Sequence, residues 1–411
     1  MENPKIRFKG FTKDWEQRKL IDVCDYVDYR GKTPTKTDSG VFLVTAKNVK
    51  DGYIDYGASQ EYISEDDYEE VMHRGKPEIG DVLITTEAPC GNVAQVNRAD
   101  IALAQRIIKY RGQSNIVDNT YLKYYLLSPE FQDILNAKSS GGTVKGIKGS
   151  ILHQQKIKYP KYEEQFKIGS YFNNLDHLIT LHPRKCEQTK NLKKYMLQKM
   201  FPQNGAKVPE IRFDGFTYDW EQRKLGDLVD RVTRKNQDLV SELPLTISAQ
   251  YGLIDQNEFF DKRVASKDVS GYYLIENGEF AYNKSTSTDA PWGAIKRLDR
   301  YENGVLSTLY IVFGIKENNP VDSDFLVSYY STNLWHKGIH EIAAEGARNH
   351  GLLNIAPADF FETRLMIPQD IEEQKKIGKY FIELEALITL HQRKCDELKK
   401  MKKYMLQNMF I

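Results

Sequence analysis

Residues 163–201 read EEQFKIGSYFNNLDHLITLHPRKCEQTKNLKKYMLQKMF, and residues 372–410 read EEQKKIGKYFIELEALITLHQRKCDELKKMKKYMLQNMF. When the two stretches are aligned without a gap, 26 of the 39 positions are identical. Two unrelated helices would not share so many residues by chance. The chain is therefore an internal duplication, and this repeated stretch organises the rest of it.

Each copy of the repeat predicts one long helix. Apolar residues recur in steps of three and four, which is the heptad spacing of a coiled-coil seam. The seam residues are Ile168, Phe172, Leu175 and Ile179 in the first copy and Ile377, Phe381, Leu384 and Ile388 in the second. Most other positions are charged or amides, so the apolar stripe is narrow and needs a partner helix, for which the other copy is the obvious candidate. Two unrelated surface helices on separate domains are the alternative.

A second repeat shows that both halves of the chain have the same plan. PKIRFKGFTKDWEQRKL at residues 4–20 recurs as PEIRFDGFTYDWEQRKL at residues 209–225, with 14 of 17 positions identical. We predict a mixed α and β domain at 1–160, a helix at 161–201, a linker containing Pro and Gly at 202–208, a second such domain at 209–368 and a second helix at 369–411. Because only the ends of the halves align, the two domains are expected to share a fold but to present different surfaces.

The composition limits the functional classes without choosing one. The chain has 411 residues, of which 28% are charged, and a net charge of +1, which neither proves nor excludes a polyanionic partner. It lacks an apolar run long enough to span a membrane, and MENPKIRF lacks the apolar core of a signal peptide. Four scattered cysteines do not suggest a disulfide framework. We therefore expect a cytoplasmic protein with no membrane partner.

Both middle regions are rich in side chains that reach phosphates and base edges. Arginine reads guanine and Asn or Gln reads adenine, whereas Lys, Thr and Ser mostly hold phosphate. Any one of these residues could be an ordinary loop residue, so the argument rests on their repetition in both halves. The candidate DNA-binding residues are Arg30, Lys32, Thr33, Thr35, Lys36, Lys47, Asn48, Thr85, Thr86, Arg106, Thr143, Lys145 and Lys148 in the first region, and Arg234, Lys235, Asn236, Gln250, Tyr251, Asn283, Lys284, Ser285, Ser287, Arg348, Asn349 and His350 in the second.

Patterns that would indicate an enzyme are absent from the sequence. The glycine-rich stretches SSGGTVKGIKGS and EGARNHG do not have the spacing of a nucleotide-binding loop. The chain also lacks the Asp/Asn-Pro-Pro-aromatic tetrapeptide with which adenine methyltransferases hold a flipped base. Glu373 and Lys375 stand near Asp370, but their spacing is that of ordinary charges on a helix surface. We predict no catalytic residues in this chain.

Two further features of the long helices carry predictions. His182 with Cys186, and His391 with Cys395, are residue types that could hold zinc if the helices brought them together. The simpler interpretation, and our prediction, is no metal, with these residues fixing the helix register. Pro183 stands where the second copy has Gln392. An interior proline costs a helix about 3 kcal/mol, so we predict a kink or break near Leu181 and His182.

The motifs PxIRFxGFTxDWEQRKL and EEQxxIGxYFxxLxxLITLHxRKC, in this order and twice, resemble the specificity (S) subunit of type I restriction-modification systems over nearly the whole chain. The resemblance implies an α+β fold with two target recognition domains, each followed by a long helix, and with the two helices packed as an antiparallel coiled coil. Each domain would read one half of an asymmetric split target in double-stranded DNA.

The resemblance also implies partners and cofactors. Two modification (methyltransferase) subunits would bind the helices, with restriction subunits outside them. S-adenosylmethionine would be held by the modification subunits, and ATP and Mg²⁺ by the restriction subunits, so we expect no cofactor in this chain. The alternatives are a coiled-coil scaffold that binds no nucleic acid, and a self-contained DNA methyltransferase or nuclease.

Overall fold

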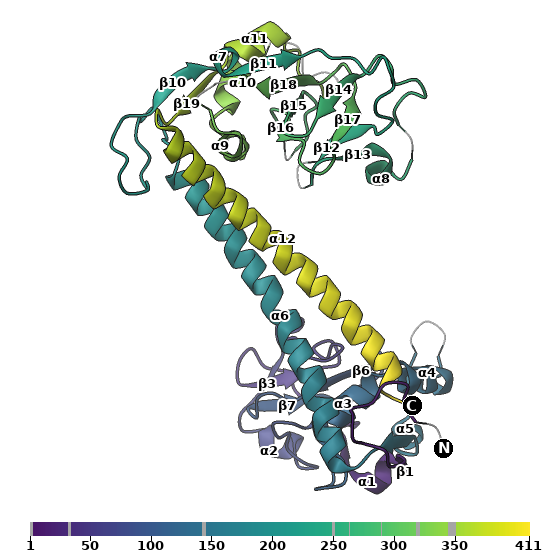
Figure 1. The fold of residues 1–411 in the computed structure, drawn as a ribbon. Helices are drawn as coiled ribbons and strands as arrows, with labels where there is room; N and C mark the ends of the chain where they lie inside the picture. The colour runs from purple at the N-terminus through teal and green to yellow at the C-terminus, as the bar shows by residue number, and fades with distance from the viewer. Residues whose placement is uncertain are drawn as a thin grey trace. The chain divides into compact units, whose positions relative to one another are not determined.

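The computed structural model describes residues 3–31, 34–141, 145–248, 251–262, 264–288, 290–317, 321–343 and 351–411 (Figure 1). The chain divides into two compact units. The first unit consists of residues 1–184 and 392–411, and the second consists of residues 185–391. Each unit therefore contains one middle region together with parts of both long helices.

The first unit is an α+β domain built on a four-stranded antiparallel sheet. Its elements are β1 (Glu16–Lys19), α1 (Leu20–Val23), β2 (Cys24–Asp28), β3 (Val41–Val44), β4 (Tyr62–Ile63), α2 (Tyr68–Val71), β5 (Val82–Thr86), β6 (Cys90–Gln95), β7 (Ile101–Leu103), β8 (Ile107–Gly112), α3 (Asn119–Leu127), α4 (Pro129–Lys138), α5 (Gly149–His153) and β9 (Lys156–Tyr159). The main sheet has the order β2-β8-β5-β6, beside a β4-β3-β7 sheet and a β1-β9 pair. The long helix α6 (Tyr162–Lys199) begins in this unit.

The second unit repeats this arrangement. Its elements are β10 (Glu221–Lys224), α7 (Leu225–Leu228), β11 (Val229–Val232), β12 (Leu245–Ser248), β13 (Gly252–Asp255), α8 (Gln256–Phe260), β14 (Tyr273–Glu276), β15 (Phe280–Asn283), β16 (Ala294–Arg297), β17 (Asn303–Leu306), β18 (Ile311–Ile315), α9 (Ser323–Tyr329), α10 (His336–Ile342), α11 (Pro357–Glu362), β19 (Arg364–Ile367) and α12 (Ile371–Asn408). The main sheet has the order β11-β18-β15-β16, with smaller pairs β10-β19, β12-β13 and β14-β17. The main sheets have the same topology, so the prediction of a shared α+β fold is confirmed.

The repeated opening motif closes each domain. The strand EQRK pairs antiparallel with the last strand of its domain, Glu16 opposite Tyr159 in the first unit and Glu221 opposite Ile367 in the second. The next residue, Leu20 or Leu225, is fully buried. The opening motif thus joins the start of each domain to the strand that leads into the long helix.

A buried ion pair explains why the opening motif and the helix motif recur together. Glu164, at the start of α6, has a side chain only 1% exposed, and its Oε1 lies 2.7 Å from Nε of Arg7. Glu373, at the start of α12, makes the same contact with Arg212 at 2.7 Å. Both arginines also donate through Nη2 to the second carboxylate oxygen at 2.8 Å. Burial makes such a pair costly to break, because one charge would be left unpaired.

A glutamine next to each buried glutamate fixes the helix to its domain. Gln165 accepts a hydrogen bond from the backbone N–H of Asp118, and Gln374 accepts one from the N–H of Asp322. These two aspartates are the N-caps of α3 and α9. Aspartate is favoured at an N-cap because its carboxylate accepts a hydrogen bond from a backbone N–H in the first turn of the helix. The repeated EEQ sequence is therefore a structural device inside each domain.

Within the first unit, the two helix segments run antiparallel, because residue numbers rising along α6 meet numbers falling along α12. The contacting pairs are Phe172 with Phe410, Asp176 with Lys402, and Ile179 with Cys395. The second unit shows the same direction of pairing. Its pairs are Cys186 with Ile388, Lys193 with Glu385, and Phe201 with Phe381. Seven of the eight predicted seam residues are buried, and Ile179 is half-buried.

The C-terminal ends of the long helices complete the domain cores. Met409 and Phe410, which directly follow α12, are buried in the core of the first unit. There Phe410 packs against Tyr121 and Phe172. The first domain therefore takes part of its core from the end of the second long helix.

Pro183 does not interrupt α6, which continues from Tyr162 to Lys199. The predicted break is therefore wrong. Pro183 is exposed and lacks the N–H that would bond the carbonyl of Ile179 four residues earlier. The thiol of Cys395 donates to that carbonyl instead, with Sγ and O 3.8 Å apart. A replacement donor and an exposed ring together explain why the helix continues.

Candidate nucleic-acid interface

The loops that the sequence singles out come together at corresponding places in the two units. In the first unit, the carbonyl of Thr86 accepts from the N–H of Ile147, and Glu87 pairs with Gly146. Residues 86–90 and 145–148 are called the first loop pair. They follow β5 and precede α5.

In the second unit, the N–H of Thr286 donates to Gly351, and the N–H of Leu353 donates to Lys284. Residues 284–288 and 351–353 are called the second loop pair. They follow β15 and precede α11. The two loop pairs therefore occupy the same position in the shared topology, although their residues differ.

Several predicted DNA-binding residues are exposed on or beside the loop pairs. Lys145 and Lys148 are exposed on the first loop pair. Arg106 is exposed too, with its Nε 3.7 Å from Glu87 and its carbonyl accepting from the N–H of Thr86. These side chains give the first loop pair a basic surface suited to phosphate and base contacts.

The second loop pair carries smaller polar groups. Ser285 and Ser287 are exposed, whereas Asn283 and Lys284 are half-buried. Asn283 accepts a hydrogen bond from the N–H of Ser285 at 3.0 Å, which shapes the loop. Tyr251, another predicted residue, is 51% exposed.

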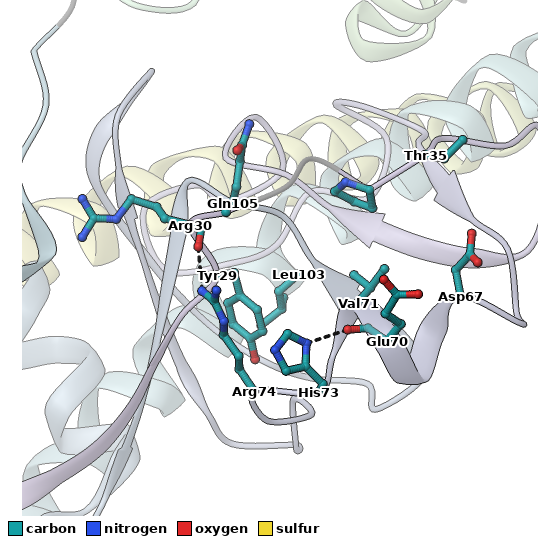
Figure 2. A pocket seen from close by; sticks show the side chains of 12 residues that line it. Tyr29, Arg30, Thr35, Asp67, Glu70, Val71, His73, Arg74, Leu103 and Gln105 are labelled. Atoms are coloured by element: carbon teal, nitrogen blue, oxygen red, sulfur yellow. Dashed lines mark hydrogen bonds between the residues drawn. The ribbon is translucent and has the colours of Figure 1, made fainter.

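A pocket of about 250 Å³ lies beside Arg30 in the first unit (Figure 2). Thr35 and Gln105 line it, and Arg74 closes it by donating to the carbonyls of Asp28 and Arg30 at 3.0 and 2.6 Å. The side chain of Arg30 extends away from the pocket floor (Figure 2).

The Arg30 guanidinium is paired with Asp28. The Asp28 carboxylate accepts from Nε and Nη2 of Arg30, with the shortest contact 2.5 Å, and this hydrogen bonding raises the pKa of Arg30. Asp28 and Gly149, which packs against this pair, were not among the residues predicted from the sequence. In the sequence, the order Asp-Tyr-Arg indicates this pairing, because it places the carboxylate two residues before the guanidinium.

The prediction that Asn48 and Asn236 contact DNA is wrong, because both side chains are fully buried. The Asn48 amide donates to the carbonyls of Asp55 and Ser59. Its oxygen accepts from the N–H of Thr45. The Asn236 amide donates to the carbonyl of Ser241 and accepts from its N–H. These asparagines hold loops in shape and do not face solvent.

The prediction that Thr85 and Thr86 contact DNA is wrong for the same reason. They are 0% and 4% exposed, on the last two positions of β5. Thr85 accepts from the N–H of Asn92, and Thr86 donates to the carbonyl of Arg106. Their hydroxyl groups are used within the sheet.

Other predicted cations are held by neighbouring groups. Lys36 pairs with Glu61 at 2.7 Å, and Arg234 pairs with Glu279 at 3.0 Å. Lys235 donates to a backbone carbonyl and lies 3.8 Å from the centre of the Tyr273 ring. Thr35 and Lys47 are exposed. Seven predicted residues lie outside the described parts of the chain: Lys32, Thr33, Thr143, Gln250, Arg348, Asn349 and His350.

The zinc alternative finds no support in the described ranges. They contain no group of three or more His, Cys, Asp or Glu side chains placed to hold a metal ion. The thiols of Cys186 and Cys395 each donate to a carbonyl of the facing helix segment instead. In the same ranges, none of the helices is long and apolar enough to span a membrane.

Comparison with known proteins identifies the class of the first half. Residues 12–191 match the family described as the type I restriction modification DNA specificity domain. The description of that family names DNA specificity.

Relatives and a solved structure extend the comparison. The type I restriction enzyme MjaIX specificity subunit of Methanocaldococcus jannaschii is 27% identical over 233 residues, 53% of this chain and 52% of the relative. The putative MjaX specificity subunit of the same organism is 24% identical over 97% of this chain and 93% of its own length. A crystal structure of the type I restriction-modification S subunit from M. genitalium has the same fold, with a TM-score of 0.60 at 13% identity, covering 100% of this chain and 99% of that one.

The chain is thus similar to type I restriction-modification specificity subunits, the resemblance that its repeated motifs predicted. The alignments span about half of the length of the MjaIX and MjaVIII relatives, 52% and 50%.

Proposed function

We propose that this chain is the DNA-recognition subunit of a type I restriction-modification complex and that it reads an asymmetric bipartite target, one half-site per unit. The observation that carries the proposal is the contrast within the repeat. The two units keep the same sheet order and the same buried ion pair to the long helix. Their loop pairs occupy the same position but present different side chains. A common framework with two different surfaces suits two different half-sites.

The chemistry of the loop pairs supports DNA as the ligand. The first loop pair offers Lys145 and Lys148 beside Arg106, all exposed. Cations of this kind hold phosphates, and arginine also reads guanine in the major groove. The second loop pair offers Ser285 and Ser287, whose hydroxyls can donate or accept.

The partners and cofactors follow from the same proposal. The two long helices act as a scaffold for two modification subunits, which hold S-adenosylmethionine, and restriction subunits hold ATP and Mg²⁺. This chain itself binds and positions the duplex in the cytoplasm. Its own residues transfer no group and require no cofactor.

Mapping of methylated bases tests the proposal. Cells that express this chain with its modification subunits should methylate a motif made of two unlike half-sites separated by an unread spacer of fixed length. A palindromic or continuous motif would contradict the assignment of one half-site to each unit. Methylation that does not depend on this chain, or a purified chain that methylates DNA alone, would contradict the role as a recognition subunit.

A further inference from the structure

One side of the Arg30 guanidinium is held and the other is exposed. Nε and Nη2 donate to the carboxylate of Asp28 at 2.9 and 2.5 Å. Nη1 donates to none of the residues that the structure describes, and the Arg30 side chain is 48% exposed. The outer Nη1 and Nη2 hydrogens therefore form a pair of donors directed away from Asp28.

The backbone that carries this pair is fixed as well. Arg74 donates from Nη1 to the carbonyl of Arg30 (Figure 2). The same Nη1 also donates to the carbonyl of Asp28. Tyr29, between them, is buried, and its hydroxyl donates to the carbonyl of Gly75 at 2.6 Å. A side chain that is already ordered loses less conformational entropy when it binds a ligand.

Gly149 places the Arg30 and Asp28 pair beside the first loop pair. A Cβ atom on Gly149 would lie 2.5 Å from Nη2 of Arg30 and 2.6 Å from Oδ2 of Asp28. A side chain at this position would force the ends of Arg30 and Asp28 to move, so glycine lets the pair keep its observed place. Lys148 of the first loop pair directly precedes Gly149, so an exposed lysine is joined to the residue that packs against Arg30.

The charge balance at Arg30 favours a base over a phosphate. Asp28 already neutralises the guanidinium, and its carboxylate would repel a phosphate placed next to it. The outer donors keep their direction and spacing. Two parallel N–H groups match O6 and N7 of guanine in the major groove, which is the commonest specific contact of arginine.

We propose that Arg30 reads a guanine in the half-site of the first unit and that Asp28 is its positioning residue. This inference rests on the proposed function. Counted from the repeated Leu20 and Leu225, the corresponding residue of the second unit is Lys235. Its Nζ donates to the carbonyl of Gly271 and it has no donor fork. The second unit therefore carries no arginine at this place, which is consistent with two unlike half-sites.

The test uses the chain assembled with its modification subunits and a set of duplexes in which each base pair of the mapped target is replaced in turn. For Arg30→Ala, discrimination at one G·C pair of one half-site should fall about tenfold to one-hundredfold. All other positions should keep their preference, and the dependence of affinity on salt should not change. Arg30→Lys keeps the charge but loses the fork, so it should show the same loss.

Arg98 provides a matched control. It pairs with Asp100 two residues away, as Arg30 pairs with Asp28, but its guanidinium packs on the ring of Tyr56. Arg98→Ala should leave every base preference intact. Asp28→Asn, which removes the negative charge and one of the two acceptor oxygens and keeps the arginine, should weaken discrimination at the same G·C pair as Arg30→Ala.

Three results would overturn the inference. These are an unchanged base preference in Arg30→Ala and Arg30→Lys, a loss at several positions in both half-sites, and a uniform loss of affinity with a salt slope reduced by about 0.9, which marks a phosphate contact. If the wild-type complex itself fails to discriminate among the duplexes, the proposed function fails, and this outcome is distinct from the other three.

Discussion

The thiol of Cys395 donates a hydrogen bond to the carbonyl oxygen of Ile179, with Sγ and O 3.8 Å apart. In the second unit, Cys186 makes the same contact with Ile388 at 3.9 Å. The contact is therefore a feature of the repeat. Only in the first unit does it supply a donor to a carbonyl that a proline, Pro183, has deprived of its backbone partner.

Pro183→Gln should stabilise the protein, because it restores the residue of the second copy and the missing N–H. We expect the free energy of unfolding to rise by about 1 to 3 kcal/mol in a chemical denaturation experiment. The reciprocal change, Gln392→Pro, should lower it by about 3 kcal/mol or more. A less stable Pro183→Gln variant would show that the proline is required for the native packing of α6.

Breaking the buried ion pair should have a much larger effect than breaking an exposed one. Arg7→Ala leaves Glu164 charged and 1% exposed, so we expect a loss of about 3 to 5 kcal/mol in the free energy of unfolding. Arg18→Ala removes an exposed pair with Glu16 and should cost less than about 1 kcal/mol. Equal effects of the two variants would contradict the role given to the EEQ motif.

Phe410→Ala should destabilise the first unit selectively. Phe410 is buried and packs on Tyr121, Tyr125 and Phe172, so its truncation should cost about 3 to 5 kcal/mol. Hydrogen exchange should accelerate in α3 and spare β15 and β18 of the second unit. Phe201→Ala is the matched variant, with the reverse pattern. A uniform acceleration in both variants would argue against separate cores.

The seam and the boundaries of the long helices could be predicted because heptad spacing is a local property of the sequence. The packing of Phe410 into the first domain could not, since its partners lie more than two hundred residues earlier in the chain. The same limit applies to the candidate site. Asn48 follows a strand and looks like an exposed turn residue, and only the tertiary fold shows that Asp55 and Ser59 use its amide.

Lys123 should make stability depend on pH. It is 4% exposed, and burial lowers its pKa to about 8, with a further lowering from Lys402 and an opposing effect from Asp176. The unfolded chain then binds more protons than the folded chain between about pH 8 and the ordinary lysine pKa of about 10.4. The contribution of Lys123 to stability should therefore rise with pH across this window and stay constant below it.

Lys123→Met tests this effect. The variant should be more stable than the wild type at pH 7 by up to about 3 kcal/mol. The gain is reduced by the loss of the favourable interaction between the Lys123 ammonium and the Tyr124 ring, whose centre lies 4.1 Å from Nζ. The gain should shrink as the pH rises from 8 to 10. Lys156→Met, at an exposed position, serves as the control and should show no such trend. A Lys123→Met variant whose stability relative to wild type did not vary with pH would exclude the proposed titration.

Replacement of the second loop pair should alter one half-site and leave the other intact. Residues 283–287 hydrogen bond to residues 351–353 within the second unit, and the first loop pair belongs to a different core. Exchange of Lys284, Ser285 and Ser287 for alanine should therefore change the methylated motif at one end only, and each side chain that reads a base should account for about 1 to 3 kcal/mol of discrimination. Alanine at Lys145 and Lys148 should weaken binding more uniformly and lower the salt slope by about 0.9 for each phosphate that is no longer neutralised. If the 284–287 variant changed both half-sites in the sequenced motif, the two units could not be independent readers.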